Sequence, residues 1–165
     1  MDATTRLGLP LLIAGQAQKE IYHNEALQRI DACVAPCVVA PASASVPAGP
    51  AVGDCFLVGS GAAGAWAGQD QALAMFSAGG WRFVAAREGL RVWVTSTSSE
   101  AVFRSGAWNY GSVRGARLII GGTTVVGTQQ GAIGAPAGGT VIDSQGRTAI
   151  GQILVALRAH GLIAP

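Results

Sequence analysis

A repeated glycine–tryptophan pattern dominates the middle of this chain and most constrains how it can fold. Gly64-Ala65-Trp66, Gly79-Gly80-Trp81 and Gly106-Ala107-Trp108 share one local pattern, and Trp93 lies within residues 91–94. A glycine-marked turn followed by an aromatic residue and a short apolar run is typical of a strand that leaves a tight turn. Because the pattern recurs every 12 to 15 residues, it predicts short antiparallel strands.

The low charge of the chain predicts that part of its surface is buried against other subunits. Half of the 165 residues are apolar, which is enough for a core, but only 12% are charged, about half the usual share. Such a chain favours a homo-oligomer. The net charge of +2 and the dispersed arginines argue against nucleic acid as a partner.

The apolar segment near the N-terminus does not have the features of a targeting signal. Residues 7–14 are short for this purpose, contain Pro10 and lack a basic stretch before them, so we expect no signal peptide. No apolar run approaches the length of a membrane span, so we expect no membrane insertion.

The elements predicted along the chain place it in the α+β class. Five segments are expected: an N-terminal helical anchor or oligomerisation segment (1–39), a linker rich in Pro, Ala and Ser (40–53), an antiparallel β-module resembling a sandwich or barrel (54–126), a glycine-rich linker (127–142) and a C-terminal helix (143–165). Gly121-Gly122, between two β-branched runs, predicts a two-residue hairpin turn with positive φ.

Both predicted helices carry apolar stripes that suit an oligomer interface. The first helix spans residues 16–34 before Pro36, with apolar side chains at helical spacing on one face and polar ones opposite. In the second helix, Asp143 is a candidate N-cap and Gly161 a candidate C-terminal glycine. Helices this short need a packing partner, and a trimer is expected. The interface residues predicted on these stripes are Ile21, Leu27, Ile30, Ile150, Ile153, Leu154 and Leu157.

No catalytic or metal-binding motif is convincing, so we expect neither an enzyme nor a metal or other cofactor. Residues 59–64 match G-x-G-x-x-G but run on through Trp66 without a helix pattern, which favours a loop between strands. His23 and His160 belong to helices at opposite ends of the chain, far from any nucleophile motif. The three cysteines, Cys33, Cys37 and Cys55, are expected to be reduced and buried; zinc would need two further ligands.

The tryptophans also allow a carbohydrate-binding interpretation. A flat ring contacts the C–H face of a pyranose while polar groups hold the hydroxyls. For any single tryptophan a core position is favoured, because aromatic residues dominate small cores. Trp66 and Trp108, next to polar or glycine-rich segments, are the better surface candidates, and Trp93, within an alternating strand, is the worst. The full set of candidate glycan-binding residues is Trp66, Trp108, Trp81, Asp70 and Arg87.

A set of ordered motifs resembles a known but uncharacterised family. The motifs are Leu9–Glu20, His23–Leu27, Gly53-Asp54, Gly64–Gly68, Gly80-Trp81, Arg87–Gly89 and Gly106–Trp108. They resemble, over about residues 5–110, a domain of tailed phages, prophages and gene transfer agents, found in tail-fibre and head-spike proteins. Residues 125–130 and 156–163 resemble a segment seen at the end of phage-type fibre proteins.

The resemblance implies a structural protein on the surface of a virion or phage-like particle, assembled in the host cytoplasm. It would decorate the particle and contact the host surface through polysaccharide. Two alternatives stay open. The chain could be an adaptor that anchors another spike or fibre protein to the capsid or tail, or a small polysaccharide hydrolase with an intersubunit site that includes Asp54, Asp70 or Glu88.

Overall fold

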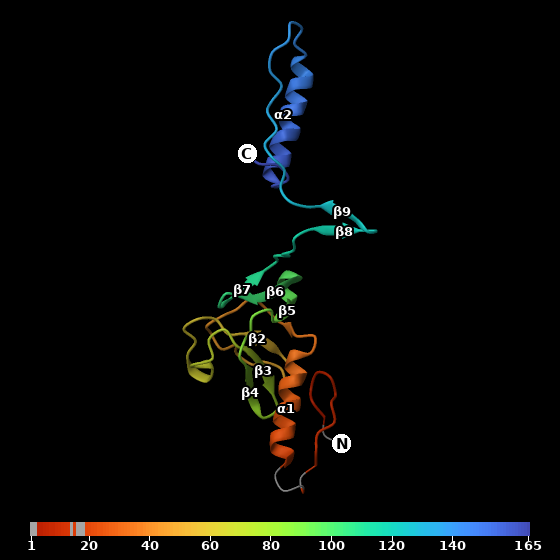
Figure 1. Cartoon of the computed structure of the whole chain (residues 1–165). Coiled ribbons are helices and arrows are strands. Elements are labelled where there is room, and N and C mark those ends of the chain that lie inside the picture. Colours follow the sequence, from red (N-terminus) through yellow and green to blue (C-terminus); the bar gives the residue numbers. More distant parts are fainter. Residues whose placement is uncertain (1–2, 14, 16–18) are drawn as a thin grey trace. The chain divides into compact units, whose positions relative to one another are not determined.

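The computed structural model describes residues 3–13, 15 and 19–165 and divides into two units, Met1–Ser112 (unit 1) and Val113–Pro165 (unit 2). Its helices and antiparallel sheets confirm the predicted α+β class, and the described residues form no closed barrel (Figure 1). No helix in the described part of the chain is both long and apolar enough to cross a membrane.

The described residues of unit 1 form one α-helix and two sheets. Helix α1 (Lys19–Cys33) precedes the first strand, and the predicted start of the helix at residues 16–18 lies outside the described residues. The first sheet is antiparallel, in the order β2 (Cys55–Leu57), β3 (Leu73–Ser77), β4 (Gly80–Val84). The second has the order β1 (Cys37–Val38), β5 (Arg91–Val94), β6 (Ser99–Arg104), β7 (Ala107–Tyr110). Two short 3₁₀ turns, η1 (Gly64–Trp66) and η2 (Thr95–Thr97), complete the unit.

Strand β1 was not expected, and it makes the second sheet mixed. It pairs parallel to β5, with Val38 opposite Val94, whereas a wholly antiparallel module was predicted. Two residues are too few for a period-2 pattern, so the sequence carries no signal for this strand. Its parallel pairing is possible because β2, β3 and β4 lie between β1 and β5 in the chain, which supplies the long connection that parallel strands need.

The two sheets of unit 1 share one apolar core. Strand alternation sends every second side chain inward, so Val92 and Val94 of β5 are buried while Arg91 and Trp93, which alternate with them, are exposed. The buried members of this core come from both sheets and from α1, and they are Ala32, Val38, Cys55, Leu57, Leu73, Met75, Val92, Val94, Ala101 and Trp108. A second buried cluster is formed by Val58, Trp66, Ala72 and Ala74.

The docking of α1 is opposite to what its pattern predicts. Tyr22 and Ile30, on the predicted apolar face, are 79% and 47% exposed, while Asp31 and Ala32 are buried. On the packed side, Arg82 of β4 donates to Glu25 at 2.7 Å. The helix therefore docks on the sheet through polar and small side chains. Amphipathic spacing alone does not show which face of a helix packs on the rest of the protein.

Asp31 holds the N-terminal loop against α1. Its buried carboxylate accepts hydrogen bonds from the Thr4 hydroxyl at 3.0 Å and from the backbone amides of Arg6 at 2.9 Å and Leu7 at 2.6 Å. The Arg6 guanidinium donates to carbonyl oxygens at the C-terminal end of the helix, including that of Ala35. A cation at this end also suits the helix dipole.

Unit 2 contains one hairpin and one helix. Strands β8 (Leu118–Ile120) and β9 (Thr123–Val126) pair with each other, so the predicted β-module of residues 54–126 spans both units. Gly121 and Gly122 have φ values of 56° and 82°, which confirms the predicted two-residue turn with positive φ.

Helix α2 (Ser144–Ala159) has both predicted caps. Asp143 accepts a hydrogen bond from the Gly146 amide at 2.8 Å. Gly161 has φ of 67°, and the amides of Gly161 and Leu162 donate back to Arg158 and Leu157. This pairing is the Schellman arrangement, in which a glycine ends the helix in a left-handed conformation.

The three cysteines are free thiols in different environments. Cys55 is buried, Cys33 is partly buried, and Cys37 is exposed, where its Sγ lies 3.1 Å from the Thr95 hydroxyl. The expectation that all three are buried was therefore wrong for Cys37, which faces outward on the short strand β1. Burial raises the pKa of the Cys55 thiol from 9.0 to about 11, and burial also raises the pKa of Cys33.

We predict that Asp31→Ala lowers the free energy of unfolding by about 3 kcal/mol, because three donors lose a charged acceptor in a buried site. Urea denaturation measures the loss. The control is Glu88→Ala, since Glu88 is exposed and accepts one backbone hydrogen bond, from Ser105; it should cost less than about 1 kcal/mol. Equal losses for the two variants would contradict the role given to Asp31.

We predict that iodoacetamide at pH 9 alkylates Cys37 much faster than Cys55 in the folded protein. The thiolate is the reactive form, and a thiol with a pKa of about 11 is only about 1% ionised at pH 9. Peptide mass spectrometry over time measures both rates, and denaturation in urea should bring them together. Similar rates in the folded state would show that Cys55 is not buried as described.

Candidate functional site

Trp66 is a core residue and is not available to a ligand. It ends the 3₁₀ turn η1 and is only 1% exposed. Its ring contacts Trp81 edge-on, with centroids 5.2 Å apart, and Phe56 at 6.1 Å. The core position favoured for any single tryptophan is confirmed here, whereas the choice of Trp66 as a better surface candidate was wrong, because the glycine-rich loop that precedes it folds the ring back onto the sheet.

Trp108 is also buried, in the core that the two sheets share. It is 7% exposed, its ring lies 5.4 Å from that of Phe103, and its indole N–H donates to the Gln71 carbonyl at 3.0 Å. Trp108 therefore links β7 to the loop before β3. The choice of Trp108 as a better surface candidate was therefore wrong, because strand alternation places this position of β7 inward.

Trp81 is half-buried and has a polar hollow beside it. Four aromatic rings, those of Phe56, Trp66, Phe76 and Phe83, lie within 6.5 Å of its ring, measured between centroids. The hollow, of about 350 Å³, is lined by Trp81, Phe83, Gln69, Arg82, Glu25 and Arg29. The Glu25 carboxylate is already paired with Arg82 at 2.7 Å and Arg29 at 3.1 Å, so these charges mainly attach α1 to β4.

Asp70 and Arg87 do not join the tryptophans in one site. The Asp70 carboxylate accepts hydrogen bonds from the amides of Gly61 and Ala62, at 2.8 and 3.1 Å. It thereby closes the glycine-rich loop of residues 59–64, which leads into a 3₁₀ turn and not an α-helix, as the loop interpretation predicted. Arg87 is exposed. The five candidate glycan-binding residues are thus distributed over two clusters and two loops.

Trp93 is the exposed tryptophan that the sequence analysis ranked last. It is 49% exposed on the outer side of β5. Glu100 lies opposite it in the β5–β6 register, and Arg91, two residues earlier, pairs with Glu100 at 2.8 Å. The alternating pattern Arg91-Val92-Trp93-Val94 was the available signal, but without the fold it does not show which set of residues faces the core.

The predicted interface residues are mostly exposed within the single chain. Ile21 and Ile30 of α1 are 61% and 47% exposed, and Ile153 of α2 is 58% exposed. Ile150 is exposed as well, and Leu27 and Leu157 are half-buried. Leu154 is an exception, since it is 4% exposed and so is not available to another subunit.

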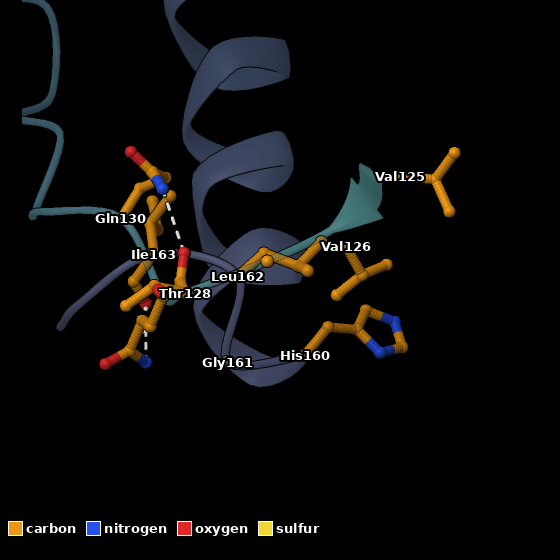
Figure 2. Close-up of a pocket in the computed structure, with 10 residues that line it drawn as sticks. Val125, Val126, Thr128, Gln130, His160, Gly161, Leu162 and Ile163 are labelled. Carbon is orange, nitrogen blue, oxygen red and sulfur yellow. Dashed lines mark hydrogen bonds between the residues drawn. The ribbon is translucent and has the colours of Figure 1, made fainter. Parts of the chain in front are cut away.

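The largest hollow in unit 2 lies beside the C-terminal end of α2 (Figure 2). It has a volume of about 400 Å³ and is lined by residues 125–130 and 160–163. Backbone pairing organises it, because the Gln130 amide donates to the Leu162 carbonyl at 3.0 Å and the Ala164 amide donates to Gln130 at 2.8 Å. His160 is its one titratable side chain, and a lone imidazole there provides no nucleophile–base pair.

His23 likewise provides no nucleophile–base pair among the described residues. It is exposed on α1, where its Nδ1 lies 2.8 Å from the Lys19 carbonyl. His23 and His160 belong to different units. Among the residues that the structure describes, no three His, Cys, Asp or Glu side chains are grouped as a metal site would need.

The chain matches one family over its central part. Residues 23–109, which are more than half of the chain and lie within unit 1, match the model of a family described as a protein of unknown function (DUF2793). The match runs from α1 to β7 and therefore includes both sheets of unit 1. A search of curated proteins found no match. On the extent of the family match, this chain belongs to the DUF2793 family.

Proposed function

We propose that this DUF2793 protein is a homo-oligomeric structural component of the surface of a phage-like particle, as a spike or fibre. Unit 2 holds the copies together, as a trimer, and unit 1 is displayed and contributes to attachment to host-surface polysaccharide. The resemblance of the sequence motifs to tail-fibre and head-spike proteins is the reason for assigning the chain to a phage-like particle. The exposed apolar residues of unit 2 support the proposal that the copies form a homo-oligomer.

The observation that carries this proposal is the absence of a sufficient core in unit 2. Only Leu154 and Ile163 are buried apolar side chains among its described residues. Large apolar residues of the hairpin and of α2 are instead exposed; they include Leu118, Ile119, Ile120, Val125, Val126, Ile150, Ile153 and Val155. A unit of this size buries too little surface to be stable alone, and other copies would supply the missing core.

Few charged side chains accompany this apolar surface from strand β8 onward, which leaves it free for self-association. From residue 118 onward the only charged side chains are Asp143, Arg147 and Arg158. Asp143 caps α2, Arg147 donates to the Gly138 carbonyl, and Arg158 donates to that of Ile133 at 2.7 Å. Both arginines thus attach the helix to the glycine-rich segment 127–142. Identical copies can bury such a surface without leaving a charge unpaired.

A specific observation also favours an anchoring role for α1. Tyr22, Ala26, Ile30 and Val34 follow one another at four-residue spacing, and all four are exposed. This row would suit contact with a capsid, tail or fibre protein, which is the adaptor alternative. Gold labelling of the chain on intact particles tests both versions: a label at the tips supports display, a label at the base supports anchoring, and no label contradicts both.

We predict that Ile153→Asp dissociates the oligomer, because it places a charge in an apolar contact between copies. Light scattering at micromolar concentration should give a multiple of 16.6 kDa for the native chain and a smaller mass for the variant. Gln152→Asp is the matched control, since Gln152 is polar and exposed and lies on a different side of α2 from the predicted stripe. A native chain of monomer mass would contradict the proposed assembly.

A further inference from the structure

The outer side of β5 presents one exposed aromatic ring in a polar setting. Trp93 is 49% exposed, although its neighbours Val92 and Val94 are buried at 2% and 0%. None of the aromatic contacts among the described residues involves Trp93, unlike those of the other three tryptophans. About half of this side chain is therefore open to solvent, which is uncommon for a residue type that usually fills cores or interfaces.

Polar groups and a rigid rim surround this ring. Glu100 faces Trp93 across the β5–β6 ladder, and the Arg91 guanidinium holds its carboxylate at 2.8 Å. On the other side, the Trp93 amide donates to the Pro36 carbonyl at 2.9 Å, which fixes the segment that connects α1 to β1. Together these elements line a shallow hollow of about 290 Å³, formed by Ala35, Pro36, Arg91, Val92, Trp93 and Glu100.

The chemistry of this hollow fits a sugar ring better than other ligands. A pyranose presents an apolar C–H face, which stacks on an indole, and peripheral hydroxyls, which accept from a guanidinium and donate to a carboxylate. An anionic ligand is disfavoured because Glu100 already neutralises Arg91. An apolar peptide is disfavoured because it would remove water from this ion pair without replacing its hydrogen bonds.

We propose that Trp93, Arg91 and Glu100 form a subsite for an uncharged hexose unit of a polysaccharide. Trp93 stacks on the sugar, and the Arg91–Glu100 pair holds two of its hydroxyl groups. Because the hollow is shallow, an internal sugar of a long chain can lie across it. The inference rests on the proposed function, since one such subsite binds weakly and repeated copies in an oligomer would provide the avidity needed for attachment.

The test is electrophoresis of the full chain in native gels that contain dextran, mannan, laminarin, galactan or alginate. We expect at least one of the four neutral polymers to retard the native protein, and alginate, which is anionic, to do so less. Trp93→Ala should weaken the retardation at least about tenfold, as expected for an anchoring tryptophan. Arg91→Met and Glu100→Gln should each weaken it to a smaller extent.

Tyr22→Ala is the matched control, because Tyr22 is an exposed aromatic residue on α1, outside this hollow. It should leave the retardation unchanged. Arg29→Ala tests the polar hollow beside Trp81 in the same way. No retardation of the native protein by any neutral polymer, or equal loss in the Trp93 and Tyr22 variants, would overturn the proposal, as would loss in the Arg29 variant alone.

Light scattering on the same samples separates this subsite from the proposed assembly. If Trp93→Ala lowers the oligomer mass, Trp93 is a subunit contact and the subsite is wrong while the assembly stands. If Ile153→Asp gives monomers that are still retarded, but more weakly, both proposals are supported. If the native chain is a monomer that is nevertheless retarded through Trp93, the subsite stands and the proposed assembly fails.

Discussion

The apolar core shared by the two sheets of unit 1 is the constraint on which the rest of that unit depends. Each strand contributes alternate residues to it, so the direction of one side chain determines that of its neighbours. In β5, Val92 and Val94 are buried in this core, so the side chain of Trp93 between them points outward. In β7, Trp108 is buried in the same core. The position of the shared core therefore decides which tryptophan is exposed to solvent.

Polar contacts, and not an apolar stripe, attach α1 to this core. The buried carboxylate of Asp31 and the Glu25–Arg82 pair are oriented toward the rest of unit 1. Apolar side chains such as Tyr22 and Ile30 are left on the outside. In unit 2, Arg147 and Arg158 likewise donate to the unit's own backbone, and most of its large apolar residues are exposed. Both units thus leave apolar side chains exposed to solvent within the single chain.

Much of the fold was predictable because turns and caps are local. Gly121-Gly122, Asp143 and Gly161 have the predicted conformations or hydrogen bonds, since the chemistry of a few adjacent residues determines them. Strand β1 was missed because two residues carry no periodic signal and its partner, β5, lies more than fifty residues later in the chain. The candidate site was predicted less well. Trp66 was chosen as a better surface candidate on the composition of its neighbours, but its burial depends on how the loop of residues 59–64 folds back onto the sheet.

By itself the sequence determined the α+β class, the glycine-marked hairpins and the two helix ends, because each follows from short-range sterics and hydrogen bonding. It also determined that the chain has few charges and excess apolar surface. Only the tertiary structure decided that α1 docks through its polar side, that Trp66 and Trp108 are buried and that Trp93 is half exposed beside Arg91 and Glu100. The physical reason is that an alternating or amphipathic pattern defines two faces, and long-range packing alone selects which of them meets the core.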